Sequence, residues 1–472
     1  MKKILILLIV FGLSSSCTDL SKLNVDNKHP KDVTAEALLT NAEEMTATRM
    51  ASTNVNYNIF KMLAQYWTET TYNDEANYDL VNRNIGGNFW TNMYDILLDL
   101  KKAKEVVDND VVTDPAIKVN KKAILDLMQV YIFHVLVDTY GNVPYSEALD
   151  IENVTPKYDD DQAIYNDLFS RIDADIAVLS NGGPSFGSAD LVYNGDVTKW
   201  IKFANSLKLR MAIRVEDATK ANQAVSGGVF TDNSDNFTLH YLKTPPHTNP
   251  IWTSLVQSGR HDFVVANTFV DKFLAVDAGD LDKRKSNYMD DNLGAGTYVG
   301  GIYGDNNRYS THTHIGQPFH QPDMPATLLG YSEVEFLLAE AAERSMVGTS
   351  ADAENHYNAG ITASFEEWGH TAAEASAYIA QPTVAYATAA PTWQEKIGVQ
   401  KWFALYGKGF EAWSSWRKLG FPVMNTPAIS GLPVPRRYIY PNDEPDVNGP
   451  NYRDAANAMG GDLLSSRVFW DN

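Results

Sequence analysis

The sequence predicts a mainly α-helical protein. Its tetratricopeptide-like helix pairs are expected to stack into a right-handed superhelical scaffold that carries a large, irregular, loop-rich insertion. Two observations favour this fold class. Apolar residues recur at helical spacing through most of the chain, in paired segments separated by short turns. Residues 220–325 break the pattern, because they are rich in Asn, Asp, Gly, Pro and His. A non-repetitive helical bundle is the alternative for the scaffold.

Apolar periodicity predicts the helices of the first half. Residues 121–137 are apolar on nearly every face, which indicates a central and buried helix. Farther along, Trp200, Phe203, Leu207 and Met211 share one face of another helix. The helices predicted in this half are 33–50, 55–70, 121–137, 160–179 and 197–215.

The later helices carry start and stop signals. Ser332 followed by Glu335 fits a capping box that opens a helix ending near Met346, and residues 352–368 form its partner. A second pair is expected to follow directly. Its signals are Thr392 with Glu395 at a helix start and Gly420 followed by Pro422 at a helix end.

The irregular regions complete the predicted organisation. A structureless loop as long as 220–325 is improbable inside a compact domain, so we expect an insertion with short strands packed on the scaffold. Residues 421–472 are also expected to be loop-like. The predicted order is a signal peptide at 1–16, a lipid anchor and polar tether at 17–31, and a single domain at 32–472.

The N-terminus indicates export and lipid attachment. Lys2 and Lys3 precede the apolar run 4–13, three serines follow, and then comes Cys17, the only cysteine of the chain. This order is typical of a secretory signal, and the run is too short to span a bilayer. Cys17 is the predicted lipidation site, although Leu13 stands four residues before it rather than the usual three. Ordinary secretion with an incidental cysteine is the alternative.

Composition excludes several functions. The net charge of −20 argues against nucleic-acid binding, which needs clustered Lys and Arg facing phosphates. A single cysteine excludes an internal disulfide and any site built from several cysteines. The 24 Tyr, 10 Trp and 19 Phe residues exceed what a core needs, which favours a binding protein with aromatic platforms.

Several stretches, ordered along the whole chain, resemble the SusD/RagB family of Bacteroidetes outer-membrane lipoproteins, in particular its SusD-like second subfamily. Any single stretch is a weak signal, whereas the ordered set is specific. The matching stretches are LNVDNKHP (23–30), DTYGNVPYSEAL (138–149), GDVTKWIKFANSLKLRMAIRV (195–215), YSEVEFLLAEAAERS (331–345), NAGITASFEEWG (358–369), KIGVQKWFALYGKGFEAWSSWRKLGFP (396–422), PRRYIYPNDEPDVN (435–448) and SSRVFWD (465–471).

The resemblance implies a role in binding and transport, with no catalysed reaction. Such proteins are anchored by lipid to the outer membrane at the cell surface, where they form the lid of a SusC-like TonB-dependent transporter. They capture oligosaccharides and deliver them to its barrel. Peptide capture by a RagB-like protein is the alternative, and a gating subunit without a soluble ligand is a third possibility. Arg210, Arg214, Arg436 and Arg437, within the matching stretches, are expected to pair with carboxylates or hold nearby carbonyls as part of the scaffold.

Sugar recognition needs flat aromatic faces for pyranose C–H groups and polar side chains for hydroxyls. The stretch from Trp67 to Trp90 supplies both in an apparent loop between helices. The ligand-binding residues predicted there are Trp67, Tyr72, Asn73, Asp74 and Arg83. An ordinary turn with a surface ion pair is the alternative.

The second candidate stretch runs from Tyr288 to Phe319, where tyrosines alternate with glycines. The resemblance places it on the irregular face that looks toward the ligand. The glycines do not follow the spacing of a dinucleotide-binding motif. The ligand-binding residues predicted there are Tyr288, Tyr298, Tyr303, Arg308, Tyr309, His312 and Phe319.

No catalytic or metal centre is predicted. The sequence carries none of the common hydrolase or nucleotide-binding motifs, and no acidic pair stands out for glycoside hydrolysis. Histidines 312, 314 and 320 are expected to be polar surface residues, since zinc would need a firmly held third ligand. We expect no cofactor. Structural calcium stays open, because it occurs in some relatives, although the aspartates at 280, 282, 290 and 291 lack EF-hand spacing.

Overall fold

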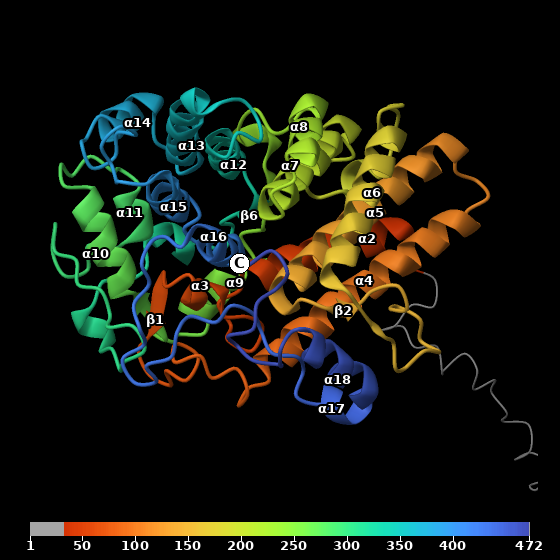
Figure 1. The fold of residues 1–472 in the computed structure, drawn as a ribbon, viewed down its shortest axis with the longest axis horizontal. Coiled ribbons are helices and arrows are strands. Elements are labelled where there is room, and N and C mark those ends of the chain that lie inside the picture. The colour runs from red at the N-terminus through yellow and green to blue at the C-terminus, as the bar shows by residue number, and fades with distance from the viewer. Residues whose placement is uncertain (1–32, 472) are drawn as a thin grey trace, which may run out of the picture.

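The computed structural model describes residues 33–471 and is mainly helical, as predicted (Figure 1). The helices pack in two series, one at the right of the view and one at its upper left, and most neighbours in the chain also pack against each other. The first series is α2 (Ala35–Ala51), α4 (Ile85–Asn109), α5 (Pro115–Tyr140), α6 (Asp161–Leu179), α7 (Val197–Arg214) and α8 (Ala218–Gly227). The second is α12 (Tyr331–Glu343), α13 (Ala353–Glu367), α14 (Ala372–Ile379), α15 (Trp393–Ala404) and α16 (Gly409–Leu419).

Local capping explains several of the helix starts. Asp114, Asp160, Asp196 and Asp217 each accept a hydrogen bond from a backbone N–H of the first turn of α5, α6, α7 and α8. The predicted start at Thr392 is confirmed, because its side chain accepts from the N–H of Glu395. The predicted end of α16 is confirmed as well. Gly420 adopts a left-handed conformation there, with φ at 77°.

Helix α5 is the centre of the scaffold, which confirms the burial predicted for 121–137. By length and hydropathy α5 could cross a membrane, but 94% of its apolar window is buried inside the protein. It packs against α4 and α6. It is therefore the core helix of a folded domain.

An ionic cluster inside the scaffold joins α5, α7, α12 and α16. Arg210 donates to Glu333 over 2.7 Å, and Arg214 pairs with Asp138 and Glu411. All five side chains are buried. The arginines therefore pair with carboxylates as predicted, and burial makes loss of any one partner costly.

The predicted insertion is held to the scaffold by short strands. Strand β5 (Phe263–Val265) pairs with β1 (Trp67–Glu69), and β4 (Phe237–Leu239) pairs with β6 (Ala326–Leu329), both antiparallel. A third pair joins β2 (Val143–Pro144) to β3 (Tyr158–Asp159). The insertion also contains α9 (Pro250–Trp252), a π-helical turn at Thr253–Gln257, α10 (Asn267–Val276), α11 (Lys285–Tyr288) and short 3-10 helices at Asn233–Asp235, Tyr309–Thr311 and Gln317–His320.

Three local predictions are wrong. The helix predicted over 55–70 is reduced to α3 (Phe60–Leu63), because the residues after it pair as β1 with the insertion. Ser332 and Glu335 form no capping box. Ser332 donates to the carbonyl of Gly360, and Glu335 contacts His356. The C-terminal region is not only loop, since it contains α17 (Glu444–Val447) and α18 (Gly449–Ala458).

The predicted signal, Cys17 and tether lie outside the described residues.

Candidate functional site

An open groove forms where the two candidate stretches meet. The β1–β5 pairing places the loop after Glu69 beside residues 258–262, and the segment 304–309 packs against both. Two adjoining hollows result, of about 340 Å³ and about 700 Å³, which share Thr71, Tyr72, Arg260 and Asp262. We call them together the groove. Its other main lining residues are Glu69, Glu75, Arg83, Ser254, Ser258, His261, Asn306, Asn307, Arg308 and Tyr309.

Tyr72 is the most prominent side chain of the groove. Its side chain is 71% exposed, which is unusual for a large aromatic residue. Its φ is 55°, in the left-handed region that non-glycine residues rarely adopt. Nine described non-glycine residues have positive φ, and four of them lie between 65 and 84. Backbone strain of this kind persists only where surrounding contacts impose it, and it is typical of binding sites.

Side-chain amides hold the loop that carries Tyr72. Asn77 donates to the carbonyl of Gly304 over 2.8 Å and accepts from the N–H of Ser430 over 2.9 Å. Asn307 donates to the carbonyl of Glu69 over 3.0 Å. These bonds join segments far apart in the sequence. The loop is thus braced from both sides, so the exposed ring stands on a fixed support.

A three-ring stack forms one wall of the groove. Tyr309 lies between His261 and His314, with ring centroids 4.2 Å and 3.7 Å away and interplanar angles of 6° and 17°. Burial raises the pKa of Tyr309 and lowers the pKa of His314. His261 is exposed at the outer end of the stack. The wall therefore offers aromatic surface that can accept the apolar face of a ligand ring.

A buried acidic pair forms the floor. Burial, and then the neighbouring Glu75 carboxyl, raise the pKa of Glu69 to about 9. One oxygen of Glu69 accepts the N–H of Ala76 over 2.9 Å. Arg83 makes an ion pair with Glu75. At neutral pH Glu69 is therefore protonated and adds no charge to the groove.

The structure brings four of the predicted ligand residues into this groove: Tyr72, Arg83, Arg308 and Tyr309. Three others lie near it without lining it. Asn73 donates to the carbonyl of Gly304, Asp74 is exposed, and His312 bonds through Nδ1 to the carbonyl of Arg308. Tyr298 is half-buried beside Lys285.

The remaining four predicted residues belong to the core, which corrects their assignment as exposed sugar platforms. Trp67, Tyr288, Tyr303 and Phe319 are each no more than 1% exposed. Trp67 donates from Nε1 to the hydroxyl of Tyr406 over 2.8 Å, and Tyr303 donates to the carbonyl of Met62 over 2.7 Å. Their rings pack against other aromatic residues, so they support the groove from behind, and Phe319 also lines the apolar cavity described below.

Sequence reasoning missed the contribution of residues 258–262. Arg260, His261 and Asp262 follow Gly259 directly, and all three line the groove. The signal was present, because a run of charged and ring-bearing residues after glycine favours an exposed loop. Its meaning depended on the β1–β5 pairing, which joins it to Tyr72.

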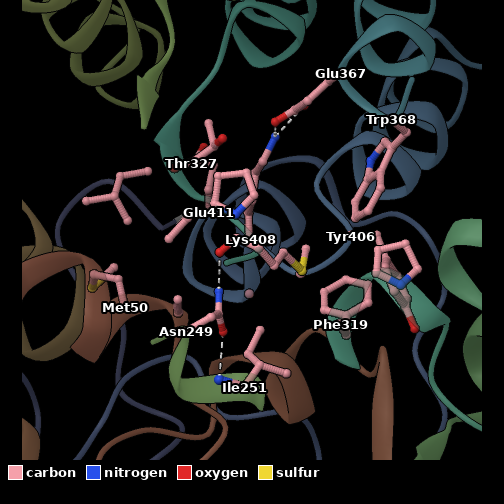
Figure 2. Close-up of a pocket in the computed structure, with 18 of the residues that line it drawn as sticks. Met50, Asn249, Ile251, Phe319, Thr327, Glu367, Trp368, Tyr406, Lys408 and Glu411 are labelled. Atoms are coloured by element: carbon pink, nitrogen blue, oxygen red, sulfur yellow. Dashed lines mark hydrogen bonds and ion pairs between the residues drawn. The ribbon is translucent and has the colours of Figure 1, made fainter. Parts of the chain in front are cut away.

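A second, apolar cavity of about 420 Å³ lies between the two helical series (Figure 2). Met50 and Ile251 line it on one side, and Phe319, Trp368 and Tyr406 line the other. It shares no lining residue with the groove. The π-helical turn after α9 separates the two, since Ile251 lines the cavity whereas Thr253 and Ser254 line the groove.

The polar groups drawn around this cavity are mostly paired with each other. Lys408 donates to both oxygens of Glu367 over 2.7 and 2.8 Å. Asn249 accepts from the N–H of Ile251 and donates to the carbonyl of Met324, each over 2.7 Å (Figure 2). The cavity therefore suits an apolar group better than a molecule with many hydroxyls.

Within residues 33–471, no group of three or more His, Asp or Glu side chains is arranged to hold a metal ion. Three of the four aspartates considered for calcium have protein partners, and the first is Asp280, which pairs with Lys285. Asp282 pairs with buried Arg284, and Asp290 accepts from Gln317.

A helical scaffold that supports an open, aromatic and polar groove defines a binding protein. The chain matches the family described as SusD-like_2, starch-binding associating with outer membrane, over residues 27–441. It belongs to this family, as its sequence motifs indicated.

Solved structures agree with this assignment. A chitin-binding protein shares 29% sequence identity with a TM-score of 0.77, over 93% of this chain and 99% of its own. A chitin-binding SusD homolog from Flavobacterium johnsoniae shares 25% identity with a TM-score of 0.75, over 92% and 97%. A SusD homolog from Bacteroides uniformis shares 27% identity with a TM-score of 0.76, over 92% and 99%. Among curated proteins the comparison finds no match.

Proposed function

We propose that this protein captures oligosaccharides at the cell surface without chemical conversion. It would deliver them, as a lid, to a SusC-like TonB-dependent transporter of the outer membrane. A lipid on Cys17 would hold it there. The family description supports outer-membrane association and starch-type ligands, and two similar structures are of chitin-binding proteins. The descriptions of these proteins favour a glycan as the class of ligand, and the groove is the site where we propose that it binds.

The observation that carries the proposal is exposed Tyr72 on a strained, braced loop beside hydrogen-bonding side chains. A pyranose ring can stack on this ring while its hydroxyls bond to Asn306, Arg308 or Ser258, which line the same groove. Such a site needs no ionised general base at its floor, in keeping with a protonated Glu69.

A second candidate function is capture of peptides, as in the RagB branch of the family. The apolar cavity favours it, because a bound peptide needs pockets for apolar side chains. Phe319 and Trp368 would contact such a side chain.

Calorimetry separates the two functions. The chain from Thr18 onward, which lacks the anchor, is titrated with a mixed oligosaccharide pool and separately with a peptide digest. Heat from the oligosaccharides that disappears in Tyr72→Ala supports glycan capture in the groove. Heat from peptides alone supports the second candidate. No heat from either pool contradicts both and leaves a gating role. Co-purification with a TonB-dependent barrel tests the partner.

A further inference from the structure

The groove is an arginine-rich patch on a strongly acidic protein. The chain has a net charge of −20, yet Arg83, Arg260 and Arg308 all line the two hollows. Glu75 and Asp262 face them, and they pair with Arg83 and Arg260. Glu69, the third acidic residue of the lining, is protonated at neutral pH. The groove therefore carries an excess of positive charge that the rest of the molecule does not share.

Arg308 is the unpaired cation of this patch. Among the described residues it makes no ion pair, and its side chain is exposed. Its backbone is nevertheless firmly held, since the carbonyl of Arg308 accepts from the N–H and from the hydroxyl of Thr311, both over 3.1 Å. The side chain of Arg308 thus extends from a fixed backbone beside Tyr309.

Arg260 presents its guanidinium in a defined orientation. Asp262 accepts from Nε of Arg260 over 2.6 Å. The two terminal nitrogens make no hydrogen bond with residues 33–471, so they are available to a ligand. A guanidinium that offers two parallel N–H groups matches the planar geometry of a carboxylate.

From these observations we infer that the groove selects oligosaccharides that carry carboxylate groups, that is, glycans containing uronic acids. Arg260 and Arg308 would hold the carboxylate, and Tyr72 would stack on the ring that bears it. This inference rests on the proposed function and narrows its ligand class. Without such a patch, the net negative charge of the protein would repel an anionic glycan. Binding of a neutral glycan, in contrast, does not require an arginine that lacks an ion-pair partner.

The test compares one ligand pool in two forms. The full lipoprotein in detergent micelles is titrated with a pool of oligosaccharides containing galacturonate and glucuronate, and with the same pool after methyl esterification. Esterification keeps the rings and removes the charge. We expect the acid form to bind about tenfold more tightly, because only the ionised carboxylate can form charge-assisted hydrogen bonds with the guanidinium groups. This preference should fade between about 0.01 M and 1 M salt, where the Debye length falls from about 30 Å to 3 Å.

Variants locate the effect. Arg308→Gln should lower the affinity for the acid pool about tenfold and leave the ester unchanged, while Arg308→Lys should lose less. The matched control is Arg453→Gln on α18. Arg453 is also exposed, makes no ion pair with the described residues and lies outside the groove lining. It should change neither affinity.

Each outcome decides the inference. Equal affinity for acid and ester, or an equal loss in Arg308→Gln and Arg453→Gln, overturns it. If only neutral oligosaccharides such as chitin fragments bind, the proposed function stands and the uronic-acid preference is wrong. If no oligosaccharide of any kind binds, the proposed function fails and the preference falls with it.

Discussion

The groove and the cavity solve opposite physical problems within one domain. The groove exposes a strained tyrosine and gathers arginines around a protonated carboxyl, at the expense of stability. The surface of the cavity is mainly apolar, and Lys408 and Glu367 in its lining pair with each other. The difference teaches that the two sites suit different ligands. The groove leaves Arg308 without an ion-pair partner among the described residues, whereas the polar groups around the cavity are mostly paired with each other.

The largest expected effect is in the cavity wall. Phe319→Ala should lower the free energy of unfolding by about 3–5 kcal/mol, because Phe319 packs on Trp67, Trp368 and Tyr406. Urea denaturation measures it. Tyr298→Ala, at a half-buried ring outside both sites, is the control and should cost far less. If glycan affinity of the folded protein also collapsed in Phe319→Ala, cavity and groove would not be separate.

The next effect is a pH dependence from the groove floor. The pKa of Glu69 is raised to about 9 in the folded state, against 4.5 for an ordinary glutamate. As the pH rises, Glu69 therefore loses its proton first in the unfolded chain. The free energy of unfolding should fall between about pH 4.5 and pH 9. We expect a loss of about 2 kcal/mol, allowing for a partly hydrated site. Thermal unfolding of Glu69→Gln should show a flatter pH profile. An unchanged slope would mean that Glu69 is ionised in the folded protein.

Tyr72 should matter for binding and not for folding. Tyr72→Ala is expected to weaken oligosaccharide binding by about tenfold, near 1.4 kcal/mol, through loss of the stacking face. Tyr72→Gly should weaken binding as much and raise stability slightly, since glycine accepts the positive φ. Val81→Ala, at a 56% exposed position of the same loop, serves as the control in calorimetry. An affinity loss in Val81→Ala as large as that in Tyr72→Ala would argue for general loop disruption.

The smallest expected effect is at the ion pair of the cavity. Lys408→Met should cost about 1 kcal/mol of stability, because both partners are mostly but not fully buried. A double-mutant cycle with Glu367→Gln isolates the pair, and glycan affinity should stay constant. A coupling energy near zero would show that solvent screens the pair despite its position.

Local chemistry made part of this protein predictable. The start at Thr392 and the end at Gly420 follow from bonds within one helical turn, and burial of 121–137 follows from its continuous apolar composition. The ordered motifs identified the family without any structural information. The prediction of a helix over 55–70 was wrong because the conformation of these residues is not set locally. It depends on pairing with β5, which is distant in the sequence.

The sequence by itself determined the helical class, the family and two of the stretches that line the groove. It could not separate Tyr72 from Tyr303, because both are tyrosines in stretches rich in polar residues. Only the tertiary structure decided that Tyr303 reaches the carbonyl of Met62 in the core whereas Tyr72 stands in solvent. The physical reason is that the exposure of a side chain and the charge around it depend on all the residues that pack beside it in space. The neighbours of Tyr72, namely Arg260 and Tyr309, arrive through strand pairing that no local pattern encodes.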